Sequence, residues 1–213
     1  MPSVTEVIDY LKEPELVNWI ENNSKAKRKA ITEESLRVGK EVDLLVQEDV
    51  REGGYLPPEG DNQICNCMKA WELWKKEKPE IFNGIVKNDM QRELSMIMDD
   101  GETVIGHPDL PIILKERWGI LDVKSSKSIW PNNYTQDAIY TEMMRLEDKI
   151  ILPRFIGILH LKKETGLFAY TEITDEAYIQ YEVSVFKARY LAFNHAKNNR
   201  EILRRQLEEE LLK

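Results

Sequence analysis

The amino-acid sequence predicts an α/β domain in which a small mixed β-sheet is flanked by helices. Apolar residues recur at helical spacing before residue 90 and after residue 174, whereas residues 91–173 hold short alternating or continuous apolar runs. Helices are followed by three strands, a helix, a hairpin and a last helix, an order typical of a mixed sheet. The 213 residues fit one domain over 1–213. We expect it to be mainly helical in 1–90, to hold the sheet and a helix in 91–173, and to end in a helical region, 174–213.

The N-terminal part is expected to consist of helices joined by short loops. Val4, Val7 and Ile8 have helical spacing, and Ser3 or Thr5 could cap this first helix. A proline breaks a helix from its interior, so the segment should be divided. The elements expected here are two short helices in 3–23 divided at Pro14, a helix over 32–50 with Thr32 as N-cap, a loop over 51–62, and a helix over 63–78.

The rest of the chain changes to strand patterns and then returns to helix. Leu94, Met96 and Met98 alternate with polar residues as in a half-buried strand, and Asp100-Gly101 is a turn signal. The expected elements are strands 91–99, 102–106 and 118–123, a helix over 134–147, a hairpin of 154–161 and 167–173, and one or two helices over 175–212 with a weak point at Asn198-Asn199. The apolar residues of this tail, which could pair with another helix, are Ile202, Leu203, Leu207, Leu211 and Leu212.

Charge and cysteine content exclude several classes of protein. The chain has 30 basic and 38 acidic residues, a net charge of −8, which excludes a uniformly basic nucleic-acid binder. It does not exclude an enzyme that confines its basic residues to one groove and holds metal ions with carboxylates. Cys65 and Cys67 are too few for a four-cysteine zinc or iron–sulfur site. The start of the chain does not resemble a signal peptide, and no apolar stretch is long enough to span a bilayer, so we expect a cytoplasmic protein without a membrane partner.

The residues that point to chemistry lie in one segment, 106–128. Asp109 follows one expected strand, and Asp122 and Lys124 are two residues apart on the next. Side chains two residues apart on a strand point to the same face, and Asp109 can meet them at the end of the sheet. Two carboxylates suit a hard cation such as Mg²⁺, and a lysine beside it can hold a water or a developing negative charge. This combination is typical of metal-assisted phosphodiester hydrolysis.

These residues resemble the signature of the PD-(D/E)XK nuclease superfamily, in particular its RecB-like branch of phage and mitochondrial exonucleases. The resemblance covers most of residues 2–173 and implies a restriction-endonuclease-like core. The matching motifs are Pro108-Asp109, Asp122-Val123-Lys124 followed by Ser125-Ser126, Gln136 to Tyr140 as Q-x-x-x-Y, Pro2-Ser3-Val4-Thr5 with Trp19, and Cys67-Met68-Lys69-Ala70-Trp71 to Pro79.

The resemblance also implies a role for the central residues. Asp109 and Asp122 would bind Mg²⁺ or Mn²⁺, and the backbone carbonyl of Val123 would complete the coordination shell. Lys124 would position the attacking water or stabilise the phosphate in the transition state. Glu93, on the preceding strand, would be a further catalytic carboxylate that could serve a second metal.

The remaining positions concern a second metal and the DNA. The family's early helix carries G-x-x-x-H with a ligating histidine, and here Gly39 is followed by Asp43 at the histidine position, where a carboxylate can still bind the metal. Two cysteines exclude the iron–sulfur cluster of some relatives. Gln136 would orient the site or contact DNA. The expected DNA-binding residues are Tyr140, Ser125, Ser126, Lys127, Trp130, Lys25 and Arg28, with Lys27, Lys29, Lys115 and Arg117 also along the channel.

The sequence therefore predicts a Mg²⁺- or Mn²⁺-dependent deoxyribonuclease, with an exonuclease acting on DNA ends or single strands favoured. A single-strand or structure-selective endonuclease is the alternative within the same chemistry. A non-catalytic DNA-binding or assembly module on a nuclease fold is the alternative outside it, and Asp43 motivates it. The expected partner is DNA, together with a homo-oligomer or a protein that loads the enzyme onto DNA.

Overall fold

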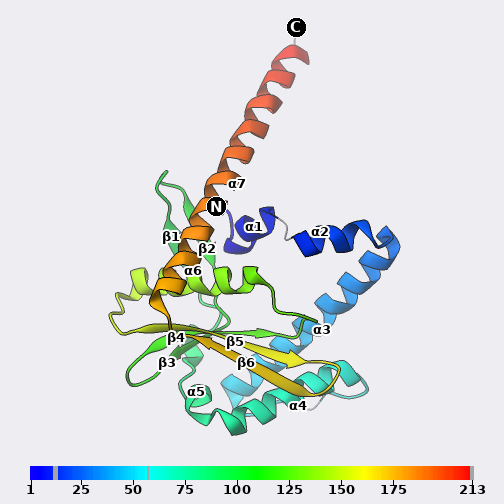
Figure 1. Cartoon of the computed structure of the whole chain (residues 1–213), viewed down its shortest axis with the longest axis vertical. Coiled ribbons are helices and arrows are strands. Elements are labelled where there is room, and N and C mark those ends of the chain that lie inside the picture. Colours follow the sequence, from blue (N-terminus) through cyan, green and yellow to red (C-terminus); the bar gives the residue numbers. More distant parts are fainter. Residues whose placement is uncertain (12–13, 57, 212–213) are drawn as a thin grey trace.

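The structure of the chain, a computed structural model, describes residues 1–11, 14–56 and 58–211 (Figure 1). Its helices are α1 (Val4–Tyr10), α2 (Pro14–Glu21), α3 (Lys25–Glu52), α4 (Asn62–Glu77), α5 (Pro79–Asn83), the 3₁₀ turn η1 (Lys87–Asp89), α6 (Pro131–Asp148) and α7 (Glu176–Leu211). Its strands are β1 (Leu94–Ile97), β2 (Thr103–Gly106), β3 (Leu110–Ile113), β4 (Trp118–Lys124), β5 (Arg154–Lys162) and β6 (Leu167–Ile173). The molecule is thus a mixed α/β structure with small sheets and flanking helices.

The first two helices are separated as the sequence predicts. Ser3 caps α1 through a capping box with Glu6, and α2 begins at Pro14, where a proline at the first helical position is favoured. The third helix differs from the prediction. It begins at Lys25, because the Ser24 side chain accepts a hydrogen bond from the Lys27 amide, and it does not begin after Thr32.

The main sheet has four strands in the order β3-β4-β5-β6 and is mixed, as predicted. Strands β4 and β5 are parallel and are connected through α6, whereas β3 and β6 pair antiparallel with their neighbours. The strand β3 was not predicted, since Pro108 and Pro111 obscure it in the sequence. The prediction of a single sheet was wrong for β1 and β2, which form a separate two-stranded hairpin around Gly101, at φ 84°.

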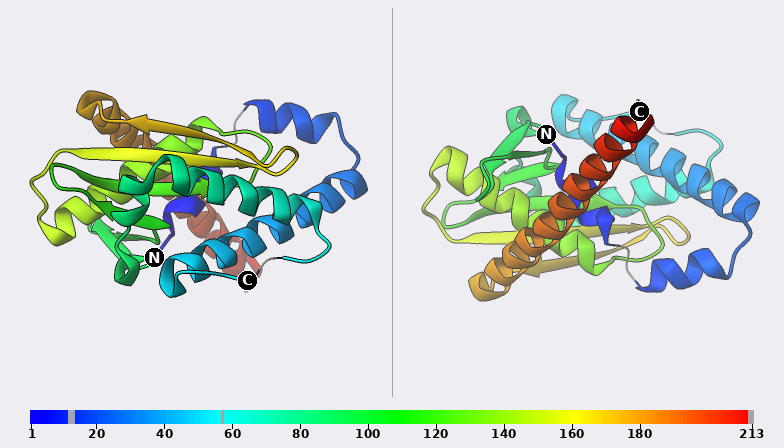
Figure 2. Two further views of the ribbon diagram at one scale, coloured as in Figure 1. Left: turned by 90° about the horizontal axis from the view of Figure 1, so that it is seen from below. Right: turned by 90° about the horizontal axis from the view of Figure 1, so that it is seen from above.

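Helices cover the main sheet on both faces. In Figure 1, α6 lies on one face and α4 and α5 on the other; Figure 2 shows α4 with α3 from below and α7 with α1 from above. Side chains of β4 alternate between the two cores. Trp118 and Ile120 pack with α6 and α7, while Leu121 packs with the α3 and α4 side, where the rings of Trp71 and Trp74 stack at 5.0 Å.

The last helix, α7, is one helix that continues through Asn198-Asn199, so the alternative of two helices is wrong within the described residues. Its first half packs on α6 and α1, and its second half extends away from the rest of the molecule (Figure 1). The residues expected to pair with another helix lie outside the described side chains: Ile202, Leu203, Leu207, Leu211 and Leu212. Within the described ranges, none of the helices has the length and apolar character to cross a membrane.

Candidate metal-dependent nuclease site

The candidate site is built around the C-terminal end of β4. Asp122 is 4% exposed, and its Oδ1 accepts a hydrogen bond from the Lys124 ammonium at 2.7 Å. Both side chains continue the alternation of Trp118 and Ile120 and therefore point to the α6 face of the sheet. The strand thus presents a carboxylate and an ammonium group together on one face.

Asp109 joins this pair from the start of β3. Its carboxylate accepts hydrogen bonds from the Val123 amide at 3.4 Å and from the side-chain amide of Gln91 at 3.1 Å. The antiparallel pairing of β3 with β4 brings the two segments together, since Leu110 is paired with Leu121. The three residues at the centre of the predicted motif are therefore neighbours in space.

Asp137 is a further carboxylate at this site, and no role was predicted for it from the sequence. It lies in α6 and is fully buried, and among the described residues neither of its carboxylate oxygens has a hydrogen-bond partner. The same holds, within this part of the chain, for the second oxygen of Asp122, Oδ2. The sequence signal that could have identified Asp137 is its place on the buried stripe of the helix, one turn before Tyr140 and Thr141 and two turns before Met144.

The charges of Asp109, Asp122, Lys124 and Asp137 act on one another, and we refer to these four residues as the carboxylate cluster. Burial, and then the negative charge of Asp122, raise the pKa of Asp109 and the pKa of Asp137 well above the ordinary value. Burial alone would lower the pKa of Lys124, but the surrounding carboxylates, Asp122 first, outweigh it and raise that pKa. The lysine is therefore held charged among carboxylates that repel one another.

Asp43 approaches the cluster from α3. Its carboxylate accepts a hydrogen bond from Gln47 at 2.9 Å, and burial raises its pKa, with the charges of Lys124 and Asp122 also acting on it. One turn earlier, a Cβ on Gly39 would lie 3.7 Å from the Ser125 hydroxyl, so α3 runs alongside the loop after β4. The position that holds a histidine in the resembled family thus carries a half-buried carboxylate within electrostatic reach of the cluster.

Glu93 lies apart from these residues. Its side chain is 64% exposed, and within the described chain its contact is with His107, whose Nε2 is 3.7 Å from the carboxylate. Gln136 donates hydrogen bonds to the hydroxyl of Tyr140 at 3.1 Å and to that of Thr5 at 3.5 Å. Tyr140 is 6% exposed and packs so closely on Gly106 that a Cβ there would overlap its ring.

The residues expected to bind DNA fall into two groups near the site. Ser125, Ser126, Lys127 and Trp130 follow β4 directly; Lys127 and Trp130 are exposed, and the Ser126 carbonyl is 2.7 Å from Nε2 of His160. This loop leads from the end of β4 to the start of α6. It therefore lies next to the carboxylate cluster.

The second group lines a pocket of about 420 Å³ between α2 and α3. Lys25, Arg28 and Lys29 line it together with Trp19, whose ring is half-buried and not part of either core. The buried Nε of Arg28 has no hydrogen-bond partner among the side chains that the structure describes. Two other expected channel residues, Lys115 and Arg117, precede β4 and so lie at the opposite end of that strand, where Arg117 pairs with Glu172.

The residues of the cluster fit a divalent cation by their chemistry. Carboxylate oxygens are the donors that Mg²⁺ and Mn²⁺ prefer. The buried oxygens of Asp122 and Asp137 without hydrogen-bond partners are of the kind that a cation would satisfy. Among the residues that the structure describes, no group of three acidic, histidine or cysteine side chains is arranged to coordinate a metal ion. The Lys124 ammonium donates a hydrogen bond to Asp122.

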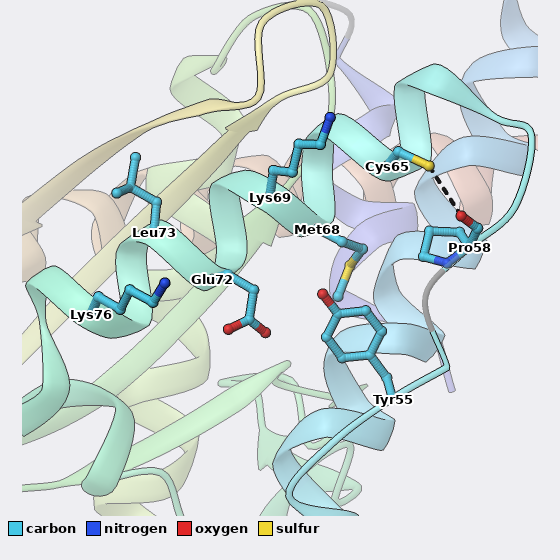
Figure 3. Close-up of a pocket in the computed structure, with 8 residues that line it drawn as sticks. All are labelled: Tyr55, Pro58, Cys65, Met68, Lys69, Glu72, Leu73 and Lys76. Carbon is cyan, nitrogen blue, oxygen red and sulfur yellow. Dashed lines mark hydrogen bonds between the residues drawn. The ribbon is translucent and has the colours of Figure 1, made fainter.

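A separate pocket of about 450 Å³ lies against the outer face of α4 (Figure 3). Met68, Leu73 and Tyr55 give it a largely apolar lining, and the Cys65 thiol donates a hydrogen bond to the Pro58 carbonyl at 3.1 Å. Its lining shares no residue with the carboxylate cluster. It is therefore not part of the candidate site.

Comparisons with known proteins give distant similarities only. No family model matches the sequence, and no curated protein matches it either. Among solved structures, the chain is similar to a candidate exonuclease from Eubacterium rectale, with 16% identity and a TM-score of 0.43 over 76% of this chain and 68% of that one. It is also similar to the protein SSO0001, with 15% identity and a TM-score of 0.32 over 56% of this chain and 55% of that one. The function is therefore inferred from the residues of the site.

Proposed function

We propose that this protein is a Mg²⁺- or Mn²⁺-dependent deoxyribonuclease that hydrolyses phosphodiester bonds. The observation that carries the proposal is the set of buried carboxylate oxygens without partners, on Asp122 and Asp137, beside a charged lysine. Buried carboxylates are costly unless they are paired or bind a cation. The Lys124 ammonium pairs with Asp122, and the raised pKa values of Asp109 and Asp137 mean that these two carboxyl groups need a proton or a cation to neutralise them. The cluster therefore has a place for a divalent cation.

Asp109, Asp122 and the carbonyl of Val123 would hold the cation. When bound, it would polarise the phosphodiester and lower the pKa of a water. Lys124 stays protonated, because the carboxylates raise its pKa. Its ammonium can donate hydrogen bonds to the attacking water or to a phosphate oxygen and so stabilise the negative charge that develops there. Gln136, held by Tyr140 and Thr5, would orient the entrance to the site.

For a second cation, Asp43 is the better candidate of the two carboxylates considered. The charges of Lys124 and Asp122 act on Asp43, whereas the contact of Glu93 in the described chain is with His107. A role for Glu93 would need its exposed side chain to turn away from His107. The proposal therefore includes Asp43 as the ligand that stands in for a histidine.

DNA would lie along α3. Lys25 and Asp43 are five turns apart and on the same face of this helix, about 27 Å along its axis. The face begins at the pocket of Trp19 and Arg28, where cations can bind phosphates and the indole can stack on a base. It ends at the carboxylate cluster beside Lys127 and Trp130. Basic and aromatic side chains at the two ends of this face, with Glu33 beside Lys29 at the pocket, suit a single strand or a DNA end, which favours an exonuclease.

The experiment is a cleavage assay with end-labelled linear and closed circular DNA, single- and double-stranded, in Mg²⁺, Mn²⁺ or EDTA. Asp109→Asn is the variant, and circular dichroism shows that it is folded. Metal-dependent loss of linear DNA alone, absent in the variant, is expected for an exonuclease. Loss of circles indicates the endonuclease alternative. DNA binding without cleavage in any metal would overturn the enzymatic proposal in favour of a binding or assembly module. A separate measurement, gel filtration with and without DNA, tests the expected homo-oligomer.

A further inference from the structure

Asp137 differs from the other buried acids of the described chain. Glu142, 8% exposed and on the same helix, is paired with Arg145 at 2.7 Å and with Arg154 at 2.8 Å. Asp49 and Glu182 also have hydrogen-bond partners: Trp71 and Lys75 for Asp49, and Thr135 for Glu182. Asp137 is fully buried, and neither of its carboxylate oxygens has a hydrogen-bond partner in the part of the chain that the structure describes. A carboxylate kept in such a place is unfavourable for folding, so a role outside folding is the physical reason to look for.

The cation available to Asp137 is Lys124. Helix α6 packs on β4, and the side chains of Asp122 and Lys124 point to that face. The charges of Asp137 and Lys124 act on each other, although Lys124 donates its hydrogen bond to Asp122. A lysine ends in a compact ammonium on a flexible four-carbon chain, so it can change its partner without a backbone movement.

We propose that Asp137 is a positioning residue that takes the Lys124 ammonium when a divalent cation binds Asp122. This inference rests on the proposed function, because the cation belongs to it. A cation at Oδ2 of Asp122 would repel the ammonium that is bonded to Oδ1 and so favour its transfer to another carboxylate. Asp137 then gives the ammonium a second buried partner inside the site, so that Lys124 stays beside the reacting water and does not turn out to solvent. Lys124 thus has two alternative partners, Asp122 without the cation and Asp137 with it.

A stability measurement separates this role from a structural one. In EDTA, Asp137→Asn replaces a buried carboxyl group that has no hydrogen-bond partner among the described residues, and we expect its melting temperature to be no lower than that of the wild type. The matched control is Glu142→Gln, the same change of carboxyl to amide on the same helix. It should lower the melting temperature, because Arg145 loses its charged partner and Arg154 keeps only Glu176. A fall for Asp137→Asn equal to that of the control would overturn the proposal, since it would mean that Asp137 is a structural partner.

A metal-binding measurement tests the role itself, with Mn²⁺ as the probe in isothermal titration calorimetry. We expect Asp137→Asn to weaken Mn²⁺ binding by about tenfold or more, the usual loss when a residue that supports a metal site is removed. In a Lys124→Met background the same substitution should change Mn²⁺ affinity by less than about twofold, because Asp137 acts through the ammonium. An equal loss in both backgrounds would overturn the proposal and make Asp137 a direct ligand.

The outcomes also separate this inference from the proposed function. If Asp137→Asn weakens Mn²⁺ binding only when Lys124 is present, but the wild type cleaves no DNA, only the nuclease proposal fails. If cleavage is metal-dependent and Asp137→Asn has wild-type Mn²⁺ affinity, only the positioning role fails. A wild-type protein that binds no Mn²⁺ overturns both.

Discussion

Replacing Lys124 by methionine tests how the carboxylate cluster is stabilised. The substitution keeps a long unbranched side chain and removes the ammonium that donates to Asp122 at 2.7 Å. The cluster then holds Asp109, Asp122 and Asp137 without a neutralising lysine. We therefore expect the variant to be less stable than the wild type in EDTA and to cleave no DNA.

The magnitude follows from the burial of the pair. Removing one partner of a fully buried pair costs about 3–5 kcal/mol, whereas an exposed pair is worth less than about 1 kcal/mol. The Lys124 side chain is 23% exposed and that of Asp122 is 5% exposed, which puts this pair between the two limits. A loss of about 2–3 kcal/mol corresponds to a fall in melting temperature of about 4–12 °C for a protein of this size.

The assay is thermal unfolding followed by circular dichroism, in EDTA and in Mn²⁺. Lys127→Met is the matched control, because this exposed lysine lies three residues further on and its loss should change stability by less than about 0.5 kcal/mol. Mn²⁺ at about 100 times its Kd should add about 2.7 kcal/mol to any variant that binds it. A melting temperature for Lys124→Met equal to or above that of the wild type in EDTA would refute the reasoning, since it would mean that the ammonium does not stabilise the cluster.

Three further predictions concern the framework that holds the site. Arg154→Met should destabilise the protein by about 3–5 kcal/mol in urea unfolding, because the buried Glu142 then keeps only Arg145 and Glu176 loses its arginine. Arg92→Met, at a more exposed pair with Asp148, should cost less than about 1 kcal/mol, and equal effects would contradict this difference in burial. The hydrogen bond from Arg145 lowers the pKa of Glu142, against the effect of burial, so its stabilising contribution is present above the unfolded-state pKa and is lost as the pH falls through the folded-state pKa. The stability difference between wild type and Glu142→Gln, measured in urea, should thus shrink from pH 7 to pH 3, and a constant difference would disprove this. Gly119→Ala should destabilise the protein by about 1–3 kcal/mol or more, because its Cβ would overlap a carbonyl of β5, while Gly54→Ala, where a Cβ meets nothing within 4 Å, should be neutral in the same measurement.

Local signals explain which elements could be predicted from the sequence. The division at Pro14, the turn at Gly101 and the hairpin of β5 and β6 each depend on residues within a few positions of one another. The start of α3 was predicted wrongly because Thr32 was interpreted as the cap, whereas the good helix formers before Thr32 continue the helix back to Ser24. The strand β3 was missed because pairing with β4 forms it despite its proline.

The sequence predicted only those residues of the candidate site that belong to a linear motif. The spacing of Asp109, Asp122 and Lys124 brings them together because β3 and β4 are neighbours in the sheet. Glu93 occupies a matching position in the sequence, but the direction of its side chain depends on His107, which a motif does not contain. Asp137 could not be assigned a role from its position, since its burial and its lack of partners are properties of the packed helix.

The central claim is that the carboxylate cluster binds a divalent cation that drives phosphodiester cleavage. The most direct measurement is the cleavage rate of end-labelled single-stranded DNA at increasing Mn²⁺, for the wild type and for folded Asp122→Asn. We predict a wild-type rate that rises from zero in EDTA and saturates, and a variant at least about a hundredfold slower, because Asp122 is a ligand of the cation that would stabilise the developing charge. A wild-type rate that does not depend on Mn²⁺, or a variant as fast as the wild type, would contradict the claim.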